Sequence, residues 1–181
     1  MKKLLLLLFI TLFITLLSGI QSHVFARGVE QKPAQFISSI FNDSIPKAQV
    51  LWLSKADKII VADILQHKFK LLRIRYWQKI TKKNNESVWI LNEIGKEKPI
   101  TIGVNIKNQQ IVQLKVLAYR ESRGDEVRHS FFTKQFDSAK LTKKNKLDRH
   151  IDGITGATLS VRALTKVARL ALWLDQKINT Q

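Results

Sequence analysis

Two runs of alternating apolar and polar residues, joined by a very short polar link, constrain the fold more than any other feature of the chain. They span residues 100–107 and 112–118, and Asn108, Gln109 and Gln110 separate them. Successive side chains of a strand point to opposite faces of a sheet, so a period of two indicates a strand with one buried face. Two such runs on so short a link predict an antiparallel hairpin. Its buried face is expected to carry Ile100, Ile102, Val104, Ile106, Val112, Leu114, Val116 and Ala118.

The rest of the chain adds strands and helices to this hairpin. Residues 50–53 are short and apolar, and residues 71–77 and 87–94 are typical of two further strands about a polar turn at 82–85. Apolar residues at helical spacing predict helices over 33–41, 57–67, 127–136 and 159–176. The chain has no internal repeat and no low-complexity linker. We therefore expect a single α+β domain, a twisted antiparallel sheet with flanking helices.

The first 26 residues have the pattern of a secretory signal peptide. A short basic start precedes an apolar run over 4–20, and small or compact residues precede a cleavage site after Ala26. Cleavage would release the chain into the periplasm, with an N-terminal helical and strand part at 27–95 and a core at 96–181. An uncut leader would instead anchor the chain in the inner membrane, although its apolar run is short for a bilayer span.

Composition and charge limit the chemistry further. The chain has no cysteine, which excludes disulfides, thiol catalysis, cysteine-ligated metals and iron–sulfur clusters. Its 31 Lys and Arg residues against 14 Asp and Glu give a net charge of +17, and five of these cations lie within residues 140–149. Such a balance favours an anionic partner. Export argues against nucleic acid, which leaves phosphate, anionic lipid headgroups or an acidic protein. For residues 140–149, a solvated surface is the alternative.

The stretch Asp152-Gly-Ile-Thr-Gly-Ala-Thr-Leu-Ser160 lies just before the last predicted helix. Its glycines and alanine let the backbone turn tightly and leave room for a bulky group. The first N–H groups of the helix lack partners within the helix, and the helix dipole is positive at this end. These features favour an anion, phosphate above all. From the residues alone, Thr158 is either a helix cap or the acceptor of a covalent group.

This stretch resembles the flavinylation motif of the FMN-binding domain family, whose members include flavin-carrying components of the sodium-pumping NADH:quinone reductase and of the related Rnf complex. In that family, the last Thr of a Ser/Thr-Gly-Ala-Thr core carries FMN through a phosphoester bond made by a dedicated FAD-dependent flavin transferase. The resemblance implies that Thr158 is the acceptor. It extends upstream to about Pro99 and, more loosely, as a likeness to small exported FMN-binding proteins of Gram-negative bacteria, over the whole mature chain.

The resemblance also implies FMN-binding roles for the neighbours of Thr158. Small residues would leave room for the transferase, and hydroxyls would cap the helix or donate hydrogen bonds to the phosphate. Asp152, the first residue of the motif, would be recognised by the transferase; the alternative is that it only caps the loop. The expected binding residues in this stretch are Asp152, Gly153, Thr155, Gly156, Ala157, Thr158 and Ser160.

A second loop, Glu121-Ser122-Arg123-Gly124, follows the predicted hairpin. It corresponds in position to the family's Glu-Thr-Pro-Gly loop, which lies against the bound flavin, so all four residues are expected to bind FMN. Arg123 would place a cation beside the flavin where the family has proline; pairing with a neighbouring acid, or a solvated turn, is the alternative. Candidates to stack on the isoalloxazine ring are Trp77, Trp89 and Tyr119, although strand aromatics are more often core residues.

Two functional hypotheses result. The first is an exported electron-transfer flavoprotein with FMN bonded to Thr158, a carrier or redox-chain module rather than a stand-alone enzyme. It would need the flavin transferase for maturation, and a redox donor and acceptor that are either soluble or membrane-bound. The second is a periplasmic adaptor that binds an anionic partner or membrane surface through its basic faces and carries no flavin. The acceptor motif favours the first hypothesis, because an adaptor has no physical need for it.

Overall fold

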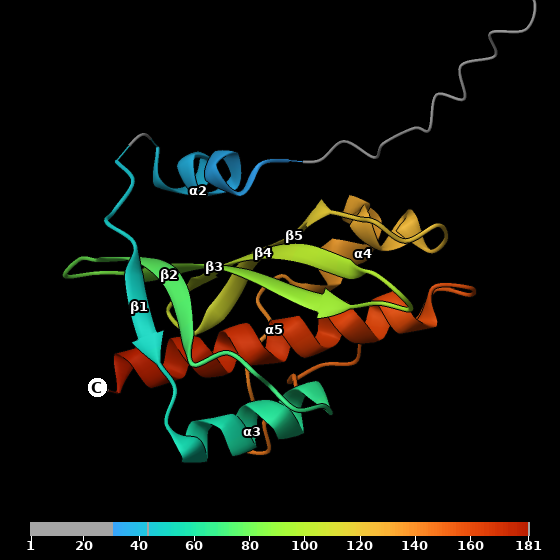
Figure 1. The fold of residues 1–181 in the computed structure, drawn as a ribbon. Helices are drawn as coiled ribbons and strands as arrows, with labels where there is room; N and C mark the ends of the chain where they lie inside the picture. Colours follow the sequence, from blue (N-terminus) through green and yellow to red (C-terminus); the bar gives the residue numbers. More distant parts are fainter. Residues whose placement is uncertain (1–30, 43, 181) are drawn as a thin grey trace, which may run out of the picture.

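The structure, a computed structural model, describes residues 31–42 and 44–180 (Figure 1). Five strands form one antiparallel sheet in the order β1-β2-β3-β4-β5, so each strand pairs with its neighbour in sequence. The predicted single α+β domain is confirmed, whereas the predicted leader lies outside the described residues. The elements are α2 (Pro33–Phe41), β1 (Gln49–Trp52), α3 (Lys55–Leu65), β2 (Arg73–Ile80), β3 (Asn85–Ile94), β4 (Pro99–Lys107), β5 (Gln110–Ala118), α4 (Ser130–Thr133) and α5 (Thr158–Asn179).

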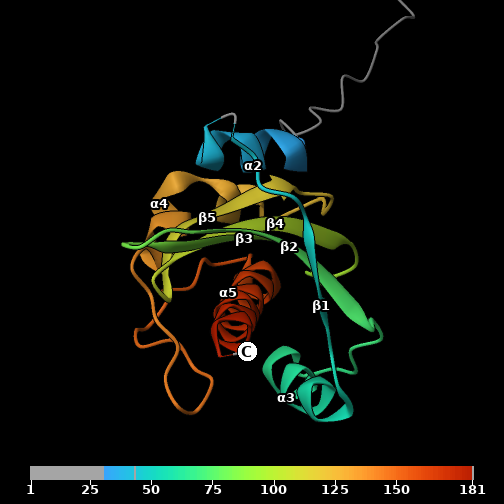
Figure 2. The same cartoon turned by 90° about the vertical axis from the view of Figure 1, so that its left-hand side faces the viewer.

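The long helix α5 lies across one face of the sheet and forms the main core with it (Figure 2). Its apolar residues at helical spacing are buried, among them Leu164, Val167 and Leu172. The inward side chains of β4 are fully buried as well, which confirms the face predicted for this strand. At the C-terminal end of α5, Lys177 Nζ lies 2.9 Å from Asp57 Oδ1 and ties α5 to α3. In the described part of the chain, no helix is long and apolar enough to cross a bilayer.

The short helix α2 covers the opposite face of the sheet (Figure 2). Its buried residues include Phe36, which packs with Val88 of β3 and Leu117 of β5. Gly103 of β4 makes this packing possible, because a Cβ at that position would lie only 2.5 Å from the Phe36 ring. The sheet is therefore enclosed by helices on both faces, but α2 is too short to cover all of the outer one.

Two sequence-based predictions were wrong in detail. Val112 does not point inward: the β4–β5 register skips it between Gln113 and Ile111, and its side chain is exposed. A one-residue bulge of this kind changes which side chains face the core. The helix predicted over 127–136 is a succession of short turns, with 3₁₀ turns at Asp125–Arg128 and Lys134–Phe136 on either side of α4. The extended backbone of His129 separates the first turn from α4.

Candidate functional site

A cleft of about 590 Å³ opens where the β3–β4 turn, the loop after β5 and the N-terminus of α5 meet. These three segments adjoin because the end of β3, the start of β4 and the end of β5 lie at the same end of the sheet. The volume is in the range of small-molecule and cofactor sites. The cleft is lined by Lys96, Glu97, Glu121, Ser122, Arg123, Gly156, Ala157, Thr158, Leu159 and Ser160.

The start of α5 presents unpaired backbone donors to this cleft. The first bond of the helix ladder runs from Val161 N to Ala157 O, so the N–H groups of Thr158, Leu159 and Ser160 precede it. No side chain in the described structure caps this end of the helix. Because free N–H groups and the positive end of the helix dipole coincide here, the position favours a phosphate group.

Thr158 lies on the wall of the cleft with an exposed side chain. The N-cap position is occupied by Ala157 and not by Thr158, and the Thr158 hydroxyl makes no hydrogen bond within the described residues. Gly156 has a φ of 84°, a left-handed conformation that glycine adopts readily and that turns the chain into the helix. The local backbone therefore leaves the Thr158 hydroxyl exposed on the cleft wall and does not engage it in a helix cap.

The loop after β5 packs directly on this turn. Gly124 has a φ of 83°, and a Cβ on it would lie 3.0 Å from the Tyr119 hydroxyl and 3.2 Å from the Ala157 Cβ. A side chain at this position would thus be both strained and crowded. The two sequence motifs, which are separated along the chain, form a single site because a glycine lets their backbones approach this closely.

Tyr119 links the two motifs through hydrogen bonds. Its hydroxyl donates to the Arg123 carbonyl oxygen at 2.6 Å, so the Ser160 hydroxyl, 2.9 Å away, donates to the Tyr119 oxygen. Burial raises the pKa of the Tyr119 hydroxyl despite the bond from Ser160, so the donor proton is kept. The expectation that Ser160 caps the helix or binds phosphate through its hydroxyl is corrected: its buried hydroxyl holds Tyr119 in place. Tyr119 braces the cleft and is not among its lining residues.

Glu121 lines the cleft, and its carboxylate also binds the turn between β3 and β4. Its Oε1 accepts hydrogen bonds from the backbone N–H groups of Lys96, Glu97 and Lys98 at 2.5, 2.8 and 3.0 Å. Burial alone would raise the pKa of this carboxyl, but the three donors lower it, so Glu121 stays ionised. Gly95 is needed beside it, since a Cβ there would lie 2.8 Å from Oε1. Glu121 therefore fixes the β3–β4 turn on one side of the cleft.

Arg123 is an exposed cation on the cleft wall. The alternative that it pairs with Asp125 is wrong, because Asp125 Oδ2 lies 3.0 Å from Arg128 Nη2 and the Arg123 guanidinium has no ion pair among the described residues. Lys96 supplies a second cation to the lining and lies 3.6 Å from Glu97 Oε1. The sequence analysis did not identify Lys96 and Glu97 as site residues, because a polar turn between strands carries no motif. The adjoining Gly95 was the only local sign of a tight turn there.

The first part of the motif does not line the cleft. Asp152, Gly153 and Thr155 are exposed residues ahead of α5. The Asp152 backbone N–H donates to Gln135 Oε1 at 2.7 Å, which anchors the chain and leaves the carboxylate in solvent. Gly153 has open space around its missing side chain, so the fold itself does not require a glycine there.

The two tryptophans proposed to stack on a flavin lie elsewhere. Trp89 is fully buried and stacks on Tyr76 with ring centroids 4.9 Å apart, so it is a core residue. Trp77 packs beside α2 on the outer face of the sheet. The core alternative is right for Trp89, whereas Trp77 is a partly buried residue of the outer face.

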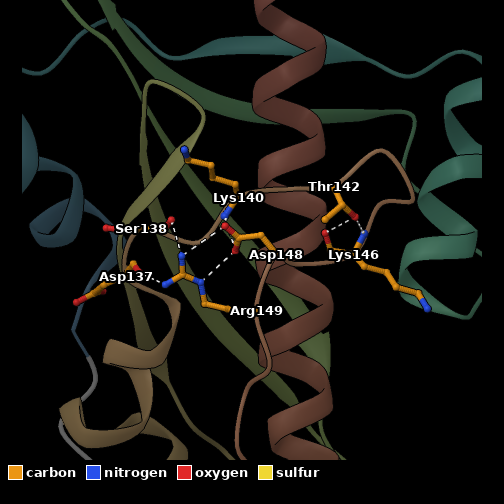
Figure 3. Close-up of polar contacts among 7 residues, drawn as sticks. All are labelled: Asp137, Ser138, Lys140, Thr142, Lys146, Asp148 and Arg149. Atoms are coloured by element: carbon orange, nitrogen blue, oxygen red, sulfur yellow. Dashed lines mark hydrogen bonds and ion pairs between the residues drawn. The ribbon is translucent and has the colours of Figure 1, made fainter.

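The basic loop, residues 140–149, is ordered by its own polar contacts (Figure 3). Arg149 donates to the carbonyl oxygens of Asp137 and Ser138, at 2.7 and 2.9 Å, and to Asp148 Oδ1 at 3.0 Å. Through that bond Arg149 holds the pKa of Asp148 below its usual value. None of the loop's residues lines the cleft. The loop is thus a separate basic surface, with its lysines exposed.

Comparison with known proteins identifies the domain. Residues 95–172 match the family model of the FMN-binding domain. The chain carries an FMN-binding domain. The crystal structure of Shewanella oneidensis NqrC is similar in fold, with 15% sequence identity, coverage of 78% of this chain and 84% of that chain, and a TM-score of 0.55. No curated protein matches the chain.

The residues of the cleft fit FMN. The matched region contains all three segments that line the cleft. Free N–H groups at the start of α5, together with Lys96 and Arg123, suit the phosphate, and the volume suits a cofactor. FMN binding through this cleft is therefore consistent with both the family and the geometry.

Proposed function

We propose that this protein is an exported electron-transfer flavoprotein that carries FMN through a phosphoester bond to Thr158. The observation that supports it best is the Thr158 hydroxyl, which is exposed on the wall of the FMN-binding domain's cleft and has no hydrogen bond to any residue that the structure describes. In the attachment reaction, this hydroxyl would attack the flavin-side phosphorus of FAD. The diphosphate bond would break, AMP would leave, and the hydroxyl would lose its proton. A flavin transferase would provide the catalysis.

Each part of the site has a function in this proposal. Bound FMN would supply the redox chemistry, and the protein would hold it and tune its potential. The N–H groups at the start of α5 would stabilise the remaining phosphodiester charge by about 0.3–1 kcal/mol. Asp152 and Gly153, exposed and not needed by the cleft, suit recognition by the transferase. A redox donor and acceptor, soluble or membrane-bound, would complete the pathway. The rival adaptor without flavin is disfavoured by the match to the FMN-binding domain.

The covalent bond can be tested by expressing the chain beside an active flavin transferase. We expect a yellow, fluorescent band that survives denaturing electrophoresis, and an intact mass increased by that of one FMN less water. The purified protein should also bleach on chemical reduction and recover in air. A folded chain that shows only the apoprotein mass would contradict the proposed linkage.

Export is a second part of the proposal, and it concerns residues 1–26, outside the described structure. If the leader is cleaved, the protein in the periplasmic fraction should begin at Arg27. An intact N-terminus in the membrane fraction would show an anchored form instead. N-terminal sequencing of both fractions distinguishes these outcomes.

The Arg123→Gln variant should lower the midpoint potential of the bound flavin by tens of millivolts. Reduced flavin is anionic near neutral pH. Arg123 is a cation on the cleft wall, with no ion pair to the part of the chain that the structure describes, and it would stabilise that charge. The measurement is a redox titration of fully flavinylated protein. Lys144→Gln is the matched control, because it removes one charge from the basic loop, away from the cleft. Equal potentials in the wild type and Arg123→Gln would show that this guanidinium does not act on the flavin.

A further inference from the structure

The outer face of β1 and of the adjoining first residues of β2 is left uncovered in the described structure. Helix α2 lies over β3, β4 and β5 of this face, and no helix is drawn beside the outer side of β1 (Figure 2). The β1–β2 register pairs Trp52 with Arg73 and Val50 with Arg75, so these four side chains share one face. Their inward neighbour Leu51 is buried. The strand pair thus has one side in the core and the other side in solvent.

This face exposes unusually large apolar side chains. Trp52 is 62% exposed, Val50 is 43% exposed, and Leu71, just before β2 and beside Arg73 in the groove, is 58% exposed. Beside them is a groove of about 310 Å³ whose walls include Phe69 and Trp77. Contiguous apolar surface of this kind on a soluble domain typically marks an interaction site.

Cations surround these apolar groups. The segment of residues 68–75 reads Lys-Phe-Lys-Leu-Leu-Arg-Ile-Arg and contains no acid. The Arg73 guanidinium lies 5.7 Å from the centre of the Trp52 ring, so charge and aromatic surface are presented together.

We propose that this basic-apolar surface, formed by Val50, Trp52, Leu71, Arg73 and Arg75, binds the surface of a bilayer that contains anionic phospholipid. Tryptophan and leucine are suited to the headgroup boundary, and the flanking cations to the lipid phosphates. The mixture of charge and apolar area distinguishes this surface from the basic loop, which offers charge alone. The inference is independent of the covalent attachment of FMN.

The position of this surface is compatible with electron transfer at a membrane. Figure 1 shows β1 beside the C-terminal end of α5, whereas the cleft is at the N-terminal end of that helix. A chain bound to lipid through β1 and β2 would therefore leave the cleft open to redox partners.

The test uses the full chain with vesicles of phosphatidylcholine, alone or mixed with phosphatidylglycerol. We expect cosedimentation with the mixed vesicles, which the double variant Arg73→Gln/Arg75→Gln weakens about thirtyfold, the effect of two membrane-adjacent cations. The matched control, Lys143→Gln/Lys144→Gln, removes the same charge from the basic loop and should bind nearly as well as the wild type. Equal weakening by both double variants, or none by either, would overturn the proposal.

Tryptophan emission gives a reading specific to this surface, whichever other part of the chain reaches the lipid. Mixed vesicles should shift the emission to the blue, and Trp52→Phe should remove most of the shift, because Trp52 is 62% exposed whereas Trp77 and Trp173 are partly buried and Trp89 is fully buried. An unchanged shift in Trp52→Phe would contradict the proposal. The double variant Trp52→Ser/Leu71→Ser gives a second check. If it changes the oligomeric state but not lipid binding, the surface is an interface between copies of the chain and the proposal is contradicted.

Discussion

The Thr158→Val variant is expected to lose covalent FMN completely while keeping the wild-type fold. Valine preserves the β-branched shape of threonine but removes the only atom that can form the phosphoester. Because the Thr158 side chain is exposed and its hydroxyl makes no hydrogen bond in the described structure, its loss should leave the melting temperature unchanged. Intact mass spectrometry after expression with a flavin transferase measures the first effect, and thermal unfolding measures the second.

Two control variants separate the chemistry of the hydroxyl from its position. Thr158→Ser retains a hydroxyl at the same place and should still acquire flavin mass. Thr155→Val removes the neighbouring exposed hydroxyl of the motif and should retain the mass, since Thr155 does not line the cleft. Covalent FMN in Thr158→Val would exclude Thr158 as the acceptor, and its loss in Thr155→Val alone would move the bond to Thr155.

The stability of the protein should depend on pH through Asp175, a buried carboxyl near the end of α5. Burial raises the pKa of Asp175 from 3.8 to about 6, although hydrogen bonds from Ser87 and Asn179 oppose the shift. The folded state therefore holds a proton that the unfolded chain releases near pH 4. The stabilisation that protonated Asp175 provides is fully present below its ordinary pKa of 3.8, and it is lost as the pH rises through about 6. A shift of this size corresponds to about 3 kcal/mol.

The Asp175→Asn variant should remove this dependence, because an amide does not titrate. The difference in free energy of unfolding between variant and wild type should move by about 2 kcal/mol in favour of the variant between pH 4 and pH 7, the rest of the shift lying below pH 4. Urea unfolding across that range measures it. Asp57→Asn is a control that should show no such change over this range. Burial would raise the pKa of Asp57, but Lys177 and Ser54 lower it below 3.8, so its effect on stability, of opposite sign, lies below pH 4. A difference for Asp175→Asn that stays constant with pH would contradict the prediction.

Local periodicity was sufficient for most of the fold. The strands at β4 and β5 and the helices at α2, α3 and α5 follow from spacing alone, because burial on one face imposes a period of two or of 3.6 on the chain. The failures occur where pairing or packing overrides the local pattern. Val112 is displaced by a bulge in the register with β4. Residues 127–136 break into turns as they fold over β5, with Phe132 and Phe136 buried and Phe131 exposed.

The sequence by itself determined the chemistry offered at the start of α5. A glycine turn, an alanine and Thr158 are contiguous, and the free N–H groups of a helix start depend only on where the helix begins. The resemblance placed residues 121–124 beside the bound flavin, but the tertiary structure alone added Lys96 and Glu97 to the cleft and decided how each residue is used. In the fold, the Glu121 carboxylate accepts hydrogen bonds from backbone N–H groups 23 to 25 residues away. The Ser160 hydroxyl likewise contacts that of Tyr119, 41 residues away. Those partners are set by strand register and by the packing of α5 on the sheet, and no local pattern encodes either.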